Sequence, residues 1–492
     1  MTADFPMNES SRPQSVHGLK KECLSYGEVL AQSVSVIAPT TVPAAVLSFA
    51  YGAAGAGTWL SFLLAMIGLL FVGINVNQFA RRSASPGSLY SYIVKGLGPT
   101  AGILCALGLM LAYLFTGMST LCGFAIFGQT MLGHLGIHTH ILTLFAFGVG
   151  LAWYVAYKDI QLSAKMMLLL EGVSIALILL LGIIIWAHKG FAIDLSQLTL
   201  KGATPGGITM GIVLAVFGFS GFESATTLGD EAQQPLKTIP KAVKQSTIWA
   251  GLFFIVMTYI EVLGFSGTSA DLAHTEAPLD FLAHQAGMDF LGFLISLGAL
   301  ASFFVCTLGC INPAARVLFL LARHGLFHRS LGNTHADTLT PHTAIGFVAL
   351  ITFLVPAIVH VFGVSTFTSQ GYFGTICTLG FLLVYVLVSI AAPVYLYQLR
   401  KLRPLDVVFS LLAIGFMALP ILGTVGIPGS TLFPVPDAPV NTFPYLFLLY
   451  LAAGCGWFFY QRVRSPRMAH RMQQAVEEIH VRYSDVNYDD RL

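Results

Sequence analysis

Residues 217–223 read Phe-Gly-Phe-Ser-Gly-Phe-Glu, in the middle of an apolar stretch, 207–229, that is long enough to cross a bilayer. Two glycines and a serine favour a break in the helix, and hydrocarbon offers no partners to the backbone groups that a break frees. Glu223 is costly in such a place, so it is a candidate functional residue. The first apolar span carries its own break, Ile-Ala-Pro-Thr-Thr-Val-Pro, at residues 37–43. Interrupted helices at matching places in two halves indicate the binding site of a secondary transporter.

The composition of the chain excludes a soluble protein. Of its 492 residues 55% are hydrophobic and 10% are charged, and the mean hydropathy is +0.77, whereas soluble domains carry roughly 25% charged residues. The formal net charge of +2 gives no indication of a nucleic-acid partner. The sequence has no P-loop and no Cys or His spacing typical of a metal site. We therefore expect a polytopic membrane protein that is not an enzyme and holds no cofactor or metal.

Apolar stretches of roughly 20 residues each predict twelve membrane spans. They are 29–52, 58–79, 99–132, 141–157, 165–187, 207–229, 245–267, 288–322, 344–363, 369–398, 405–424 and 442–461. With a cytoplasmic N-terminus, 23 of the 25 lysines and arginines fall in inner segments, and only Lys189 and Lys201 lie outside. The positive-inside rule therefore supports both the count and the orientation. We expect a multi-pass protein of the cytoplasmic membrane, lying in the lipid bilayer with both termini in the cytoplasm.

The order of the spans predicts an internal repeat. Spans 1–5 and 6–10 each open with an interrupted helix, and five is odd, so the second set enters the membrane from the opposite side. This is the inverted-topology arrangement of LeuT-type transporters. The predicted fold is all-α, with a 5+5 inverted-repeat core. The predicted segments are a cytoplasmic N-terminal segment 1–28, repeats 29–187 and 207–398, two further helices 405–461 and a cytoplasmic tail 462–492.

Four stretches resemble the amino acid–polyamine–organocation superfamily, specifically its bacterial amino-acid permease branch. They are SVIAPTTVPA at 35–44, ARRSASPGSLYSYIVKGLGP at 80–99, FGFSGFESATTLGDEAQQPLKTIPKAV at 217–243 and NPAARVLFLLARHGLFHRSLG at 312–332. They occur in the family's order. The resemblance implies twelve spans, a LeuT-like core in spans 1–10, and transport of a small solute that bears an amine.

The two breaks supply most of the candidate substrate-binding residues. In span 1 the prolines remove backbone donors and free carbonyls, and the threonines add hydroxyls. In span 6 the glycines allow close approach to a ligand, and the phenylalanines supply aromatic walls. The candidates are Ala38, Pro39, Thr40, Thr41, Phe217, Gly218, Phe219, Ser220, Gly221, Phe222 and Glu223, with Tyr113 on span 3 and Tyr372 on span 10 as possible pocket or gate residues.

The resemblance assigns roles to some of these residues. It implies that Phe219 or Phe222 gates the substrate, and that Glu223 matches an acidic residue of putrescine-type permeases. Amino-acid permeases of this kind usually carry a Gly-Ser-Gly type turn in span 1 that holds the substrate carboxylate. This chain has Ala38-Pro39-Thr40-Thr41 instead, which makes a plain amine more plausible as a substrate.

The coupling ion is left open by the sequence. Proton-coupled relatives place a lysine in span 5, which should fall near Ser174, and no lysine is present there. Glu171, one turn earlier, could titrate or could pair with a neighbour, and Glu223 could carry the proton. Ser302 and Thr307 on span 8 could bind sodium together with span 1 carbonyls. The candidates for ion coupling are therefore Glu223, Glu171, Ser174, Ser302 and Thr307.

Charges outside these breaks have more ordinary interpretations. Glu261 lies near the outer end of span 7 and could reach water. Five further charges lie near the cytoplasmic face, where they could latch an inner gate by ion pairs or be solvated or in contact with lipid headgroups: Asp230, Glu231, Lys237, Arg316 and Arg323.

Secondary active transport of an amino acid or related small amine, by alternating access, is the function we expect. The partners are this substrate and a coupling ion, proton or sodium, or a counter-substrate. The alternative is a carrier or exchanger of a polyamine or a simple amine such as putrescine or ethanolamine. A channel would need a continuous polar pore, which the spans lack. A sensor would need a larger soluble output domain than the 31-residue tail.

Overall fold

A computed structural model describes residues 19–134, 136–158, 160–275, 277–465 and 472. The helices of at least eight residues are α1 (Tyr26–Ile37), α2 (Leu47–Ala54), α3 (Thr58–Ala80), α4 (Leu89–Leu97), α5 (Pro99–His134), α6 (Ile141–Lys158), α7 (Ile160–His188), α9 (Pro205–Phe219), α10 (Pro235–Phe265), α11 (Pro278–Gln285), α12 (Asp289–Arg323), α13 (His342–Val361), α14 (Thr366–Gln398), α15 (Pro404–Val425) and α16 (Phe443–Arg464). Short helical turns complete the list: η1 (Val42–Val46), η2 (Gly55–Gly57), α8 (Leu195–Leu198), η3 (Ser224–Leu228), η4 (Leu272–His274), η5 (Arg329–Gly332) and η6 (Val440–Thr442).

The helices confirm an all-α membrane fold with twelve spans. Eleven helical stretches of the described chain are long and apolar enough to cross a membrane, and the first of them, Tyr26–Ala80, has 55 residues. That length covers two crossings at roughly 20 residues each. Most of the predicted ends of the twelve spans agree with the helices within a few residues. Parts of the two terminal segments, 1–18, 466–471 and 473–492, lie outside the described residues.

The first span is interrupted where the prolines predict it. Helix α1 ends at Ile37, and Ala38 adopts a left-handed conformation with φ 46°. After a short turn the chain continues as the wide helical turn η1, with Pro43 near its start, and then as α2. A left-handed residue cannot continue a right-handed helix, and Pro43 has no amide for the usual helical bond. The span therefore consists of two separate helical pieces.

The sixth span is interrupted in the same manner. Helix α9 ends at Phe219, and Gly221 has φ 89°, which favours glycine. The chain then forms the tight turn η3 and reaches α10 at Pro235. The two breaks open corresponding halves of the chain, α1–α7 and α9–α14, so the inverted-repeat core with broken helices 1 and 6 is confirmed.

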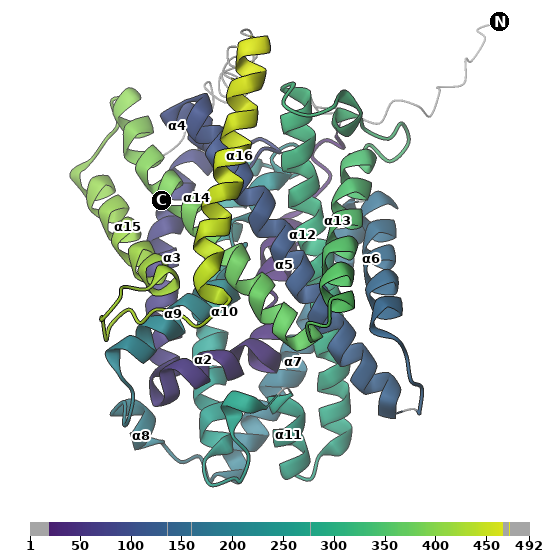
Figure 1. The fold of residues 1–492 in the computed structure, drawn as a ribbon, viewed down its shortest axis with the longest axis vertical. Helices are drawn as coiled ribbons and strands as arrows, with labels where there is room; N and C mark the ends of the chain where they lie inside the picture. Colours follow the sequence, from purple (N-terminus) through teal and green to yellow (C-terminus); the bar gives the residue numbers. More distant parts are fainter. Residues whose placement is uncertain (1–18, 135, 159, 276, 466–471, 473–492) are drawn as a thin grey trace, which may run out of the picture.

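The remaining helices pack around these two broken spans. Helix α5 packs along both α12 and α14, while α10 packs along α3 and α1. Figure 1 shows the helices running roughly parallel to the long axis, with α8 and α11 at the bottom and the C-terminal end of α16 at the top. The N-terminal segment Leu19–Leu24 lies at the same end as the C-terminus of α16. We call this the basic end, and the end with α8 and α11 the opposite end.

One helix begins much earlier than the apolar pattern predicts. Span 7 was expected from residue 245, but α10 begins at Pro235. Proline is well suited to the first position of a helix, because its missing amide has no helical partner there. The first turns of α10 carry Lys237, Lys241 and Lys244, so polarity hides them from a search for apolar stretches.

Candidate functional site

The carboxylate at the sixth-span break is held between two tyrosines. Glu223 is fully buried. Its Oε1 accepts a hydrogen bond of 2.8 Å from the Tyr113 hydroxyl of α5, and its Oε2 accepts one of 2.8 Å from the Tyr385 hydroxyl of α14. Tyr113 was a sequence candidate, and Tyr385 was not. The site thus joins the sixth span to α5 and α14.

Aromatic rings surround this carboxylate. The Phe381 ring lies edge-on to Tyr113 at 5.5 Å between centroids and stacks on Tyr385 at 5.7 Å. Phe222 packs on the other side of Tyr385 at 5.3 Å. We call Tyr113, Phe222, Phe381 and Tyr385 the aromatic cage. A buried carboxylate with aromatic side chains nearby is the chemistry that recognises an ammonium group, by charge and by cation–π attraction.

The other two phenylalanines of the break point elsewhere. Phe219 packs with Phe254 of α10 at 4.9 Å between centroids and with Phe62 of α3 at 6.5 Å, as an ordinary core residue. Phe217 lies against Gly374 of α14, where a side chain on the glycine would come within 3.0 Å of the ring. Of the two residues to which the resemblance gives a gate, Phe222 is the one beside Glu223.

The two breaks are packed directly on each other. An added Cβ on Gly221 would lie 2.0 Å from Cγ1 of Val36, and one on Gly218 would lie 2.9 Å from Cγ2 of Val42. These glycines therefore set the closest approach between the spans. Ser220 donates back to the Val216 carbonyl, as helical serines commonly do.

Serines satisfy the backbone that the sixth-span break frees. The Phe222 carbonyl accepts from Ser33 Oγ of α1 at 2.7 Å and from Ser246 Oγ of α10 at 3.4 Å. Ser224 Oγ donates to the Gln32 carbonyl at 3.1 Å. Because lipid cannot serve unpaired backbone groups, these bonds allow an irregular turn at membrane depth.

The amides of the first-span break already have acceptors. The Ala38 amide donates to the Val34 carbonyl, and the Thr41 amide donates to the Ala38 carbonyl, each at 2.9 Å. The Thr40 amide donates to Glu171 Oε1 at 3.0 Å, and Pro39 has no amide hydrogen. The Thr41 hydroxyl donates to the Ala38 carbonyl as well. This turn therefore presents no unused amide at residues 38–41 for a substrate carboxylate.

A second buried carboxylate connects α7 to the first-span break. Glu171 Oε1 accepts from both the amide and the hydroxyl of Thr40, at 3.0 and 2.9 Å. The hydroxyl of Ser302 on α12 lies beside this carboxylate. Neither Ser302 Oγ nor Glu171 Oε2 has a well-formed hydrogen bond in the described structure. Buried polar atoms without partners are rare and call for a specific explanation.

The remaining candidates for ion coupling lie apart from this pair. Ser174 donates to the carbonyls of Leu170 and Gly298, at 2.8 and 3.0 Å, and so fastens α7 to α12. Thr307 shares a hydrogen bond of 2.9 Å with Thr120 of α5. The structure thus brings Glu171, Thr40 and Ser302 together and leaves Ser174 and Thr307 in helix–helix contacts.

Tyr372 is not part of the aromatic cage. It lines a separate cavity of about 400 Å³, toward the opposite end of the molecule. Val46, Phe49, Phe217 and Phe367 line this cavity as well, and it is mostly apolar. The Tyr372 ring packs edge-on against Phe443 of α16 at 5.5 Å. Its position places Tyr372 on an approach to the breaks, and Tyr385, about four turns further along α14, at the carboxylate.

Comparison with known proteins decides the family. The family model described as amino acid permease matches residues 28–469, which is most of the chain. The chain belongs to the amino acid permease family. Its sequence is 25% identical over 369 residues to the branched-chain amino acid permease BcaP of Bacillus subtilis (strain 168), covering 71% of this chain and 75% of that protein.

Two further relatives extend the comparison. The low-affinity putrescine importer PlaP of Escherichia coli (strain K12) is 26% identical over 303 residues, covering 60% of this permease and 66% of the importer. The crystal structure of MhsT in complex with L-phenylalanine matches with a TM-score of 0.56 at 16% identity, over 82% of the permease and 99% of that chain. This likeness shows the fold alone. The permease is a multi-pass membrane transporter, not an enzyme, and moves an amino acid or related small amine.

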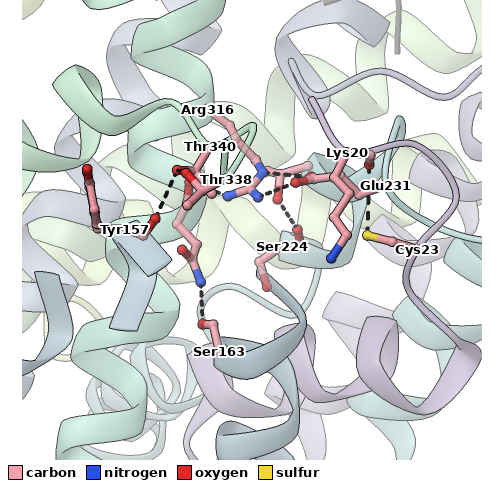
Figure 2. Close-up of polar contacts among 11 residues, drawn as sticks. Lys20, Cys23, Tyr157, Ser163, Ser224, Glu231, Arg316, Thr338 and Thr340 are labelled. Atoms are coloured by element: carbon pink, nitrogen blue, oxygen red, sulfur yellow. Dashed lines mark hydrogen bonds and ion pairs between the residues drawn. The ribbon is translucent and has the colours of Figure 1, made fainter. Parts of the chain in front are cut away.

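The basic end of the permease is closed by a buried ion pair. Arg316 of α12 donates from Nε to Glu231 Oε2 at 2.9 Å and from Nη2 to Oε1 at 2.7 Å, and both side chains are 1% exposed. Figure 2 shows this pair beside Lys20. Below the pair lies Ser163, whose hydroxyl accepts a hydrogen bond from the side-chain amide of Asn312. For Glu231 and Arg316 the structure supports the ion pair, whereas Lys237 and Arg323 are exposed.

Backbone pairing reinforces this closure. Leu24 forms an isolated parallel bridge with Ala232, the Leu24 amide donates to the Glu231 carbonyl at 2.9 Å, and the Gln233 amide donates to the Leu24 carbonyl at 2.8 Å. The N-terminal segment Leu19–Leu24 is thereby fixed to the segment that follows the sixth-span break. A movement of α12 away from this segment would have to break the ion pair between Arg316 and Glu231.

Glu261 differs most from the expectation for a residue near water. It is fully buried in α10, and neither carboxylate oxygen has a hydrogen-bond partner in the described structure. The prediction from the sequence was wrong because α11 packs against α10, which a position near the end of the helix does not reveal. It provides a useful control, since it is a buried carboxyl outside the aromatic cage.

Proposed function

We propose that the permease binds its substrate through an ammonium group at Glu223, with Tyr113 and Tyr385 as hydrogen-bonding partners in the aromatic cage. The observation that supports this most directly is the paired arrangement of Glu223 between the two tyrosines. An incoming ammonium group replaces the tyrosine hydroxyls as the partner of the carboxylate. Hydrogen bonds between two charged groups are stronger than those in which one group is neutral. The replacement of the tyrosine hydroxyls by the ammonium group is therefore favourable.

The first-span break favours simple amines over α-amino acids. Transporters with broken helices bind a substrate carboxylate at unused amides of a half-helix. In the permease the backbone amides of Ala38, Thr40 and Thr41 already donate to acceptors within the protein, and Pro39 has no amide hydrogen. A substrate without an α-carboxylate needs no such donors. We therefore propose a simple amine or diamine as the preferred substrate, in line with the similarity to a putrescine importer.

A branched-chain amino acid is the second candidate. Two observations favour it: the apolar cavity beside Phe217, and the similarity to a branched-chain amino acid permease. Competition distinguishes the two. Labelled leucine and labelled putrescine would each be measured in counterflow with purified permease in liposomes. If putrescine neither exchanges nor displaces leucine, the amine proposal is overturned.

We expect Glu223→Gln to weaken amine transport by roughly ten- to a hundredfold in KM, because a hydrogen bond to a charged group contributes about 1.5–3 kcal/mol. The measurement is the concentration dependence of putrescine counterflow. The matched control is Glu261→Gln, which makes the same acid-to-amide change at a buried carboxyl that has no hydrogen bond to a cage residue. An unchanged KM in Glu223→Gln, or an equal loss in both variants, would contradict the assignment of Glu223.

We also propose that Glu171 carries the coupling proton. A proton on Oε2 would let the carboxyl donate to Ser302 Oγ and would satisfy both unpartnered atoms. When Glu171 is ionised, its Oε1 accepts both hydrogen bonds from Thr40. Because Thr40 belongs to the first-span break, protonation of Glu171 changes the strength of these bonds and so acts on the break directly. The basic end faces the cytoplasm in this proposal, since positive residues favour that side.

The expected result for Glu171→Gln is a separation of exchange from driven uptake. Counterflow without a gradient continues at a rate similar to that of the unmodified permease, because the amide oxygen still accepts from Thr40. Acceleration by an imposed pH gradient is lost. The measurement compares both assays with inward pH or sodium gradients. Stimulation by sodium alone, or a pH response that survives in Glu171→Gln, would rule out this role.

A further inference from the structure

The loop between α3 and α4, residues 81–88, lies at the basic end together with α4 (Figure 1). We call it the α3–α4 loop. Its last residue, Ser88, is fully buried, and Ser88 Oγ shares a hydrogen bond of 2.5 Å with Thr226 Oγ1 of η3. This bond ties the loop to the segment that follows the sixth-span break. It involves neither the ion pair nor the backbone bridge described above.

The loop fills the space between that segment and α12. An added Cβ on Gly229, directly after η3, would lie 2.2 Å from the backbone nitrogen of Ser85. An added Cβ on Gly87 would lie 2.4 Å from Cδ2 of Leu320, which is one helical turn from Arg316 on α12. The loop therefore packs tightly on both neighbours, close to the ion pair.

The backbone of Ser88 is strained. Its φ of 53° and ψ of −141° form a combination that is costly for a residue with a Cβ. Such residues persist where their surroundings hold them, and they cluster at sites of conformational switching. Ser85 Oγ accepts from the Gly87 amide at 3.1 Å and shares a hydrogen bond of 3.0 Å with Ser91 Oγ. The loop thus has bonds of its own that present Ser88 to η3.

The bond between Ser88 and Thr226 crosses from one set of helices to another. Helix α4, which follows Ser88, packs along α5 and α14, and the Tyr90 hydroxyl lies 2.8 Å from His324 Nδ1 at the end of α12. Thr226 belongs to η3, which packs mainly on α1 and α10. One side of the bond is therefore anchored to α4, α5 and α14, and the other side to the two broken spans and α10.

From these features we infer that Ser88 is a positioning residue for transport. Through Thr226 it holds the α3–α4 loop against the sixth span while the basic end is closed, and this contact parts each time the end opens. Alternating access moves one set of helices against another around the binding site, and the bond between Ser88 and Thr226 lies across such a boundary. The inference does not depend on which substrate or coupling ion the permease uses.

A reversible cross-link tests whether the contact must part. In the double variant Ser88→Cys, Thr226→Cys a disulfide would hold the two Cβ atoms about 3.8 Å apart. The purified full-length permease is oxidised with copper phenanthroline and oxygen, which take up the two electrons, and mass spectrometry after alkylation confirms the disulfide. Counterflow of labelled putrescine and of labelled leucine should fall by roughly tenfold or more, because the loop can no longer leave η3. Dithiothreitol should restore it.

A second cysteine pair is the matched control. The variant Ser85→Cys, Ser91→Cys replaces two hydroxyls that also share a hydrogen bond, but both lie on the same side of the boundary. Its disulfide leaves η3 free, so counterflow should change little on oxidation, as in the unmodified permease with its native thiols. Full transport by the oxidised Ser88–Thr226 pair, an equal loss in both pairs, or failure of the first pair to form a disulfide would overturn the inference.

A labelling experiment tests the same contact without any substrate. The thiol in Ser88→Cys should be buried while the basic end is closed, so N-ethylmaleimide should modify it only when the loop leaves η3. Adding Arg316→Met, which removes the neighbouring ion pair, should speed this labelling several-fold, while Arg329→Met should not. The buried native thiol of Cys122 in α5 reports unfolding and should stay unlabelled. If Arg316→Met leaves the rate at position 88 unchanged, or raises it only together with the rate at Cys122, the role of Ser88 is refuted.

Discussion

Replacing Arg316 with methionine should be among the most destabilising single changes in the permease. The substitution leaves Glu231 buried without its partner, and breaking a buried ion pair in this way costs about 3–5 kcal/mol. We expect the melting temperature of the purified permease to fall by roughly 5 °C or more. The basic end should also open more readily, because the guanidinium no longer joins α12 to the segment that carries Glu231.

The double variant Arg316→Met, Glu231→Leu distinguishes a buried pair from two separate surface charges. With both partners replaced by apolar groups, no uncompensated charge remains, so most of the lost stability should return. Arg329→Met is the control, at an exposed residue of η5, and should change the melting temperature little. A double variant less stable than Arg316→Met would contradict this account of the pair.

Gly221→Ala should abolish most transport. The residue has φ 89°, and its added Cβ would lie 2.0 Å from Cγ1 of Val36. A left-handed conformation costs about 1–2 kcal/mol for a residue with a Cβ, before the clash is counted. The break must then move away from α1, and the bonds from Ser33 to this turn are strained. The initial rate of counterflow should fall by roughly tenfold or more.

A second substitution separates the clash from the backbone conformation. Val36→Ala removes the γ carbons that the new Cβ would meet, so the pair Gly221→Ala, Val36→Ala should regain part of the rate. Gly172→Ala is the control, because this exposed glycine of α7 has no neighbouring atom within 4 Å of an added Cβ. If Gly221→Ala transports normally, the tight contact between the two breaks has no role in function.

Local chemistry made the two breaks predictable. Pro39 and Pro43 cannot supply helical amides, and Gly221 is the natural residue for a left-handed turn, so the interruptions follow from the residues themselves. The number of spans and the inverted repeat follow from apolar length and charge placement. These features depend on neighbours in the chain and on the membrane, and not on which helix packs against which.

Contacts between distant helices were harder to predict. Tyr372 and Tyr385 both lie on one long helix, and no local pattern tells which of them reaches Glu223, because that depends on how α14 is placed against α5. Glu171 was visible as the charge within its span, but its bonds to Thr40 come from packing between α7 and the first-span break. The choice of Glu231 as partner of Arg316, rather than Asp230, also required the three-dimensional arrangement.

The two kinds of contact at the basic end, the buried ion pair and the backbone bridge, bear on how this end of the permease opens. The forked guanidinium contact and the strand-like bridge at Leu24 are both directional, and each loses its strength over a small displacement. A partly separated form would leave Glu231 and Arg316 as buried charges without their partners, which is costly. We therefore expect partly open states of the basic end to be scarce.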